Sequence, residues 1–164
     1  GGTLHIQSRA GIGSRFLLNM PRTASIMKTF LITVGDEVMG IPTSKIEKVT
    51  EVFEEDISNG TVLDNGKEIP VINLASIFNI KHEPKKFYTA MMIRNEKISK
   101  GGTPISAILA DSVGAELDAF MRPLAGGPYA KLKCATGYTV LGDGRPVFML
   151  DTTNITKIAA GIKL

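Results

Sequence analysis

Two histidines and one cysteine are the side chains of this sequence best suited to catalysis or metal binding. His5 and His82 could each act as a general acid, a general base or a phosphoacceptor. Neither lies in a motif with a partner carboxylate or nucleophile, and two histidines so far apart lack the spacing of a structural zinc site. We therefore interpret both as surface or half-buried residues.

Cys134 is flanked by Lys131 and Lys133, whose charges would favour a reactive thiolate. A single cysteine excludes an internal disulfide, and a free cysteine is among the residues most often buried. We expect Cys134 to serve as a small core residue.

A phosphate-binding loop is the alternative reading of Gly11-Ile12-Gly13. These glycines separate two strand-like runs and do not precede a helix, so a hairpin turn is favoured. The pair Met91-Met92 and also Met121 are interpreted as core-filling residues. With no nucleophile–base pair, metal cluster or nucleotide fingerprint in the sequence, we expect an interaction module with no catalytic, cofactor or metal residues.

Composition agrees with one folded domain, or one domain plus part of another. The chain has 164 residues, of which 43% are hydrophobic and 21% are charged. It contains neither an apolar run of about 18 residues nor a signal peptide, so we expect a cytoplasmic protein without membrane insertion. The net charge is +3, and the lysines are scattered rather than clustered with aromatic residues, which argues against a nucleic-acid partner.

The first 21 residues predict a β-hairpin, because apolar positions alternate on both sides of the glycine turn and Pro21 ends the second strand. A lone two-stranded ribbon is marginally stable in water, so this hairpin is expected to be the end of a neighbouring domain. Residues 22–25 would form the linker.

From residue 26 onward the pattern is mainly β, with short strands separated by turns. Asn65-Gly66 predicts a type I′ hairpin turn. Two short helices are expected, one near residues 75–78 and one that begins at Asp151 or Thr152. The run 116–122 is ambiguous and is interpreted as a strand.

A short internal repeat indicates two similar barrels. Residues 66–74 and 144–150 share a turn glycine, a basic residue and Pro-Val-x-x-Leu before a short helix. We assign residues of about 36–80 to a first barrel and of about 87–150 to a second, with the terminal strands and helix shared. Barrels this small should pack together.

Several residue runs resemble the C-terminal part of chemotaxis histidine kinases of the CheA type. The hairpin, Gly1-Gly2-Thr3 to Pro21, is similar to the closing hairpin of the histidine kinase ATP-binding domain. The rest resembles their CheW-like regulatory domain, and the carrying runs are Gly40-Ile41-Pro42, residues 69–78 and, most specifically, residues 137–151.

This resemblance implies a CheW-like fold of two SH3-like five-stranded β-barrels, preceded by the ATPase hairpin. It implies a non-catalytic regulatory and adaptor domain that couples the kinase to a CheW-type adaptor and to chemoreceptor cytoplasmic tips, in arrays at the inner face of the membrane. ATP and Mg would belong to the parent kinase, an ATP-dependent protein histidine kinase that is homodimeric through a domain absent here.

By the same resemblance, docking residues are expected on both barrels, where the outward-facing members should form one apolar patch. The apolar candidates are Val38, Ile46, Val49, Val52, Val140, Leu141 and Phe148.

Charge suggests a second docking feature. Residues 1–80 carry 7 basic and 9 acidic side chains, whereas residues 81–164 carry 12 and 7. Head-to-tail contact between homologous domains would then bring opposite charges together, with Glu51, Glu54 and Glu55 on the acidic side.

Two alternatives remain open at this stage. A free-standing CheW-type adaptor would use the same surface without a kinase. A basic nucleic-acid-binding β-barrel would instead use the more positive half of the chain, and its binding would depend on salt.

Overall fold

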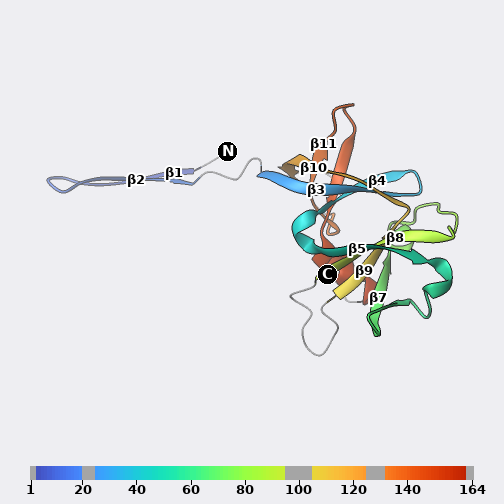
Figure 1. Ribbon diagram of the computed structural model, residues 1–164. Coiled ribbons are helices and arrows are strands. Elements are labelled where there is room, and N and C mark those ends of the chain that lie inside the picture. The colour runs from blue at the N-terminus through green and yellow to red at the C-terminus, as the bar shows by residue number, and fades with distance from the viewer. Residues whose placement is uncertain (1–2, 20–24, 95–104, 125–131, 162–164) are drawn as a thin grey trace.

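The computed structural model describes residues 3–19, 25–94, 105–124 and 132–161. These form a two-stranded hairpin, two five-stranded barrel-like sheets and two short α-helices (Figure 1). The predicted mainly-β class with two five-stranded barrels is confirmed.

The hairpin consists of β1 (Thr3–Arg9) and β2 (Gly13–Asn19), and it lies apart from the barrels in Figure 1. All its residues are exposed, including the cross-strand pairs Leu4–Leu18 and Ile6–Phe16, which share one face. The turn holds Gly11 and Gly13 at φ 75° and 132°, which confirms the turn interpretation. A ribbon with an uncovered apolar face has no core of its own.

The first sheet is a closed barrel with the strand order β10-β11-β12-β4-β3. Its strands are β3 (Ser25–Val34), β4 (Glu37–Pro42), β10 (Ser112–Pro123), β11 (Ala135–Val140) and β12 (Pro146–Leu150). The run 116–122 is therefore a strand, as predicted. β12 pairs in parallel with β4, and the other neighbours are antiparallel.

The second sheet, here called the open barrel, has the order β5-β8-β9-β7-β6. Its strands are β5 (Ile46–Phe53), β6 (Thr61–Asp64), β7 (Lys67–Asn73), β8 (Phe87–Arg94) and β9 (Ile105–Ala110). The predicted Asn65-Gly66 turn joins β6 to β7, with φ 50° and 76°. Across the seam between edge strands β5 and β6, Lys48 Nζ lies 2.6 Å from Asp64 Oδ1.

Two short helices follow equivalent strands. α1 (Leu74–Phe78) follows β7 and α2 (Thr152–Ala159) follows β12. Asn73 Oδ1 accepts from Ser76 N at 3.1 Å, and Asp151 Oδ1 accepts from Asn154 N at 3.0 Å. Such N-caps fix where each helix begins, and Asp151 is one of the two caps that the sequence predicted. Two 3₁₀ turns, η1 (Thr43–Lys45) and η2 (Glu54–Asp56), precede and follow β5.

The predicted division into barrels of about 36–80 and 87–150 is wrong. The closed barrel combines β3 and β4 with β10, β11 and β12, whereas residues 46–110 supply the whole open barrel. The order β3-β4-β5-β6-β7-α1 is repeated by β8-β9-β10-β11-β12-α2, and each repeat sends its first two strands to the barrel completed by the other. Strands adjacent in sequence usually pair locally, and within the barrels that expectation fails at β4–β5, β5–β6, β7–β8 and β9–β10. The β4–β5 and β9–β10 connections are the two that cross between barrels.

Because of this exchange, the two barrels do not carry the opposite charges that were expected from the two halves of the sequence. Residues 45–110, which contain the open barrel, carry nine basic and nine acidic side chains. Residues 26–44 and 111–164, which contain the closed barrel, carry seven of each. Each barrel is thus formally neutral, and the net charge of +3 belongs to the first 25 residues. A head-to-tail attraction between an acidic and a basic half loses its basis.

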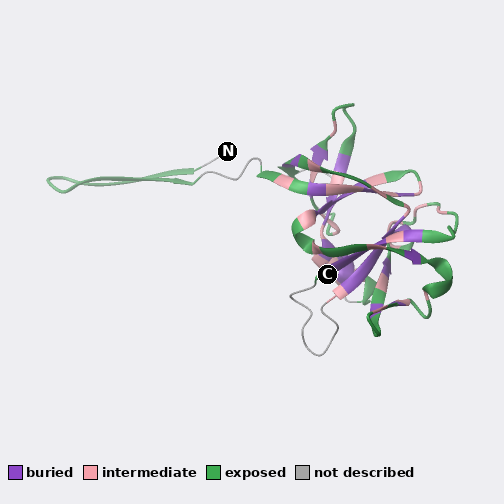
Figure 2. Cartoon of the chain, viewed as in Figure 1, coloured by how far each residue is buried: buried purple, intermediate pink, exposed green. Residues whose placement is uncertain are grey.

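The barrels are stabilised by two clusters of buried apolar side chains. Figure 2 shows the buried segments in purple. The first, here called the shared core, joins closed-barrel residues such as Ile32 and Ile41 to open-barrel residues such as Ile72 and Met91. The second lies within the open barrel and contains Met92. Met91 and Met92 are 0% and 3% exposed, which confirms that they fill cores. The barrels therefore pack as one unit.

Deleting residues 1–20 should leave the unfolding free energy unchanged within about 0.5 kcal/mol, because every described residue of the hairpin is exposed. Deleting residues 1–44 should abolish cooperative unfolding, because β3 and β4 supply the buried side chains Ile32, Val34, Met39 and Ile41. Urea titrations followed by circular dichroism test both. A molten 21–164 variant would contradict this division.

Gly137→Ala should lower the unfolding free energy by about 1–3 kcal/mol. A Cβ at this position would lie 2.5 Å from Arg122 O, at the seam where β11 pairs with β10. Gly142→Ala is the matched control, since no atom lies within 4 Å of its added Cβ. Equal melting temperatures of the two variants would show that the close contact at Gly137 does not affect the stability of the closed barrel.

Candidate functional site

The predicted docking residues do not form one patch. Val52 is only 5% exposed within the open-barrel core, so its assignment as a docking residue is wrong, because alternation along β5 turns it inward. Half-buried Ile46 packs against the shared core. Val49 and Val140 are exposed but belong to different barrels, and Leu141 follows Val140 in the turn after β11.

Val38 and Phe148, by contrast, meet in one groove of about 480 Å³, here called the docking groove. β4 and β12 are parallel neighbours, with Phe148 opposite Met39, so the structure brings together two predicted residues that are far apart in sequence. Leu150 continues the apolar wall on β12.

Another part of the docking-groove lining comes from the end of α1. Asn79 adopts the left-handed conformation at φ 53° and ends the helix, and Ile80 N then donates to Ala75 O at 2.9 Å. Phe78 and Ile80 thereby line the groove. The groove therefore lies between the closed barrel and the segment at the end of α1, which follows open-barrel strand β7.

The groove lining also contains charged residues. Asp36, Glu37 and Lys81 line it together with its apolar residues, and Leu132 and Cys134 complete the lining. Cys134 is half-buried and packs against the shared core, in line with the expectation of a small core residue. An apolar interior with charged groups beside it suits an amphipathic protein segment.

A second surface, here called the acidic face, lies at the end of β5. Glu51, Glu54 and Glu55 are exposed there, as the sequence analysis required of docking residues. The structure adds Phe53 and Phe87, which are direct cross-strand partners and are each 52% exposed. The sequence analysis missed this pair, although Phe53 follows inward-facing Val52 and must point outward.

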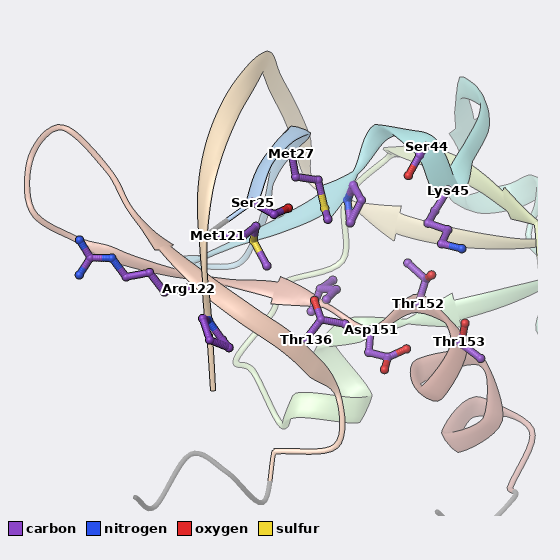
Figure 3. Close-up of a pocket in the computed structure, with 13 residues that line it drawn as sticks. Ser25, Met27, Ser44, Lys45, Met121, Arg122, Thr136, Asp151, Thr152 and Thr153 are labelled. Carbon is purple, nitrogen blue, oxygen red and sulfur yellow. The ribbon is translucent and has the colours of Figure 1, made fainter. Parts of the chain in front are cut away.

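A further hollow of about 400 Å³ opens near the start of α2. Figure 3 shows Met27 and Met121 on one side of it, with Lys45, Thr152 and Thr153 on the other. No predicted docking residue lines it, and the Asp151 carboxylate is used in capping α2. The docking groove is therefore the stronger candidate site.

His82 and Asp111 form a partly buried pair that was not predicted from the sequence. His82 Nε2 lies 2.6 Å from Asp111 Oδ1, and the side chains are 14% and 5% exposed. Gly35 N donates to Asp111 Oδ2 at 2.8 Å, and Lys85 Nζ lies 3.4 Å from the same oxygen. The His82 ring stacks on Tyr88 with a centroid distance of 5.8 Å.

The environment of Asp111 favours its ionised form. Burial alone would raise the pKa of this carboxyl, but the hydrogen bonds from His82 and Gly35 and the nearby charges of His82 and Lys85 lower the pKa below its ordinary value. No signal in the sequence links Asp111 to a histidine 29 positions away.

The remaining candidate for catalysis or metal binding within the described residues is His5. His5 is exposed on β1. No group of three or more His, Cys, Asp or Glu side chains in the described ranges could hold a metal ion. None of the helices seen there is long and apolar enough to span a membrane.

Comparison with known proteins identifies the family. A sequence model of the CheW-like domain matches residues 28–159. The chain belongs to the CheW-like domain family. It is 29% identical over 155 residues to the chemotaxis protein CheA of Bacillus subtilis, covering 92% of this chain and 22% of that protein.

Other relatives extend this result. The CheA of Rhizobium meliloti is 22% identical over all of this chain and 22% of its own length. The gliding motility regulatory protein of Myxococcus xanthus is 26% identical, over 94% of this chain and 20% of that protein. This CheW-like chain thus spans about a fifth of the length of these relatives.

A solved structure shows the same fold. The scaffolding protein TtCheW from Thermoanaerobacter tengcongensis superimposes with a TM-score of 0.63 and 16% identity, over 80% of this chain and 92% of TtCheW. The resemblance to the CheW-like C-terminal region of CheA is confirmed.

Asp111→Asn should lower the unfolding free energy by about 1–3 kcal/mol at pH 7, because it weakens buried hydrogen bonds to a charged group. Since the folded state lowers the pKa of Asp111 from 3.8, the stability this carboxylate contributes is present above pH 3.8 and is lost as the pH falls through the lower folded value. The difference between variant and wild type should therefore shrink in acid. Urea titrations from pH 7 to pH 3 measure it, and a constant difference would contradict this assignment.

Proposed function

We propose that this chain is the regulatory CheW-like domain of a CheA-type protein histidine kinase. It couples the kinase to chemoreceptor cytoplasmic tips and to a CheW-type adaptor in receptor arrays at the inner face of the membrane. ATP and Mg then belong to the rest of that kinase, whose dimerisation also uses another domain.

The hairpin supports a kinase over a free-standing adaptor. It lies outside residues 28–159, the part matched by the CheW-like family, yet the similarity to Rhizobium meliloti CheA covers the whole chain. Its exposed apolar pairs need a partner surface, which the ATP-binding domain would supply. The free-standing adaptor remains the second candidate, because the structural match to this chain covers 92% of TtCheW.

The docking groove carries the proposal for the chemoreceptor tip. Val38 and Phe148 meet in it, and its lining comes from the closed barrel and from the end of α1 with the residues that follow. Groove recognition of an amphipathic helix places apolar anchors at helical spacing into such a pocket and leaves charges at its rim. The acidic face is assigned to the CheW-type adaptor, since its exposed Phe53–Phe87 pair supplies apolar contact beside three carboxylates.

The nucleic-acid alternative loses its premise. The more positive half of the sequence is not a structural unit, because its strands are divided between two barrels that are each formally neutral. A basic stripe is what such a partner would require.

Val38→Glu should weaken binding of a receptor-tip fragment at least about tenfold, since a carboxylate would enter the apolar groove. Val140→Glu is the matched control, because Val140 is 42% exposed and does not line the groove. Calorimetric titration measures affinity, and thermal melts verify folding. Equal affinity of both variants would refute the groove as the receptor site.

Reversing Glu51, Glu54 and Glu55 to lysine should slow association with a CheW-type adaptor severalfold at low salt. At high salt the rate should approach that of wild type, because exposed charges are screened beyond about 10 Å at 0.1 M salt. Reversing Glu116 and Asp118, exposed on the closed barrel, is the control. An association rate indifferent to both the reversal and salt would remove the acidic face from the interface.

A further inference from the structure

The His82–Asp111 pair lies on the reverse side of the segments that wall the docking groove. Gly35 donates to Asp111, and the next two residues, Asp36 and Glu37, line the groove. His82 contacts Asp111, and the preceding residue, Lys81, lines the groove. One carboxylate therefore ties together the β3–β4 turn and the 79–86 connector, which are two parts of the groove wall.

The two tied segments touch without intervening side chains. A Cβ on Gly35 would lie 2.7 Å from Lys81 O and 3.0 Å from Ile80 Cγ2, and Gly35 itself has φ 58°. Backbone in such close contact transmits a shift of one segment to the other. Loosening the pair should therefore move the groove wall directly.

Asp111 is also anchored to both barrels. It is the single residue between β9 of the open barrel and β10 of the closed barrel, and its N–H donates to Thr33 O on β3 at 2.8 Å. The connector is fixed on its other side, where Lys85 N donates to the Tyr88 hydroxyl at 3.0 Å.

We propose that His82 and Asp111 are positioning residues for the docking groove, and that proton binding at this pair tightens the groove for its partner. The inference rests on the proposed function, because it assumes that the groove takes the receptor tip. Histidine is the side chain that commonly changes charge between about pH 5 and 8. A charged donor bonds a carboxylate more strongly than a neutral one, so the walls are held best when His82 is protonated.

Several charged groups lie near the His82–Asp111 pair. A cavity of about 310 Å³ is lined by His82, Asp111, Tyr88 and Glu54. Lys85 is the other charged group in contact with Asp111, and Asp36, Glu37 and Lys81 lie on the groove side.

The first test uses the cysteine that already lines the groove. A trifluoromethyl label on Cys134 in the full chain reports the groove by fluorine NMR without any partner. We expect its signal to shift between pH 6 and pH 8 in wild type and in His5→Gln, the control for the exposed histidine. It should not shift in His82→Gln, which retains a neutral hydrogen-bond donor.

The second test measures binding of the receptor-tip fragment at both pH values. Wild type should bind about fivefold more tightly at pH 6 than at pH 8, whereas His82→Gln should show a flat profile. Asp111→Asn should also be flat wherever it remains folded.

The two tests separate the two proposals. The same pH response of the fluorine signal in His82→Gln and wild type would overturn the positioning role. If Val38→Glu left receptor binding intact, the proposed occupant would be wrong, and the fluorine signal would still decide whether the pair controls the groove wall.

Discussion

The shared core depends on the exchange of strands between the two repeats. β3 and β4 complete a barrel begun by β10, β11 and β12, while β8 and β9 complete the one begun by β5, β6 and β7. Neither half of the chain can close a barrel alone, so Ile32 and Ile41 become buried against Ile72 and Met91 only when both halves are present. The stability of each barrel therefore depends on both repeats. A partner that contacts both barrels meets a rigid surface.

The same constraint creates the candidate site. β4 can lie parallel to β12 only because the first strands of the chain cross to the barrel formed by the last ones. That crossing places Val38 beside Phe148, and the shared core holds the end of α1 against them. A fold with two independent barrels would leave these apolar residues on separate surfaces.

Local features were predictable from the sequence because each depends on a few neighbouring residues. Asn65-Gly66 has the positive φ values that its hairpin turn needs, and Asp151 caps the helix that follows β12. Barrel membership was not predictable, because the repeat has the same hydrophobic pattern whether its first strands pair locally or cross over. Val52 was misplaced for a simpler reason, since its orientation depends on the alternation along β5 and not on its residue type.

Long-range polar contacts could not be predicted from the sequence for a related reason. His82 and Asp111 belong to a connector and to a crossing point that only the exchange brings together. The two crossings between barrels differ in kind: Thr43–Lys45 is a short 3₁₀ turn without buried residues, whereas Asp111 carries a buried carboxylate bound by groups from two other segments.

Apolar packing in the shared core is non-directional and tolerates small rotations of one barrel against the other. A buried carboxylate with a fixed set of donors does not, since each hydrogen bond has a preferred distance and angle. The shared core thus stabilises the contact between the barrels, and the hydrogen bonds of Asp111 fix their relative orientation. Because β3, β9 and the 79–86 connector all meet at this residue, the orientation of the groove walls is set where the chain passes from one barrel to the other.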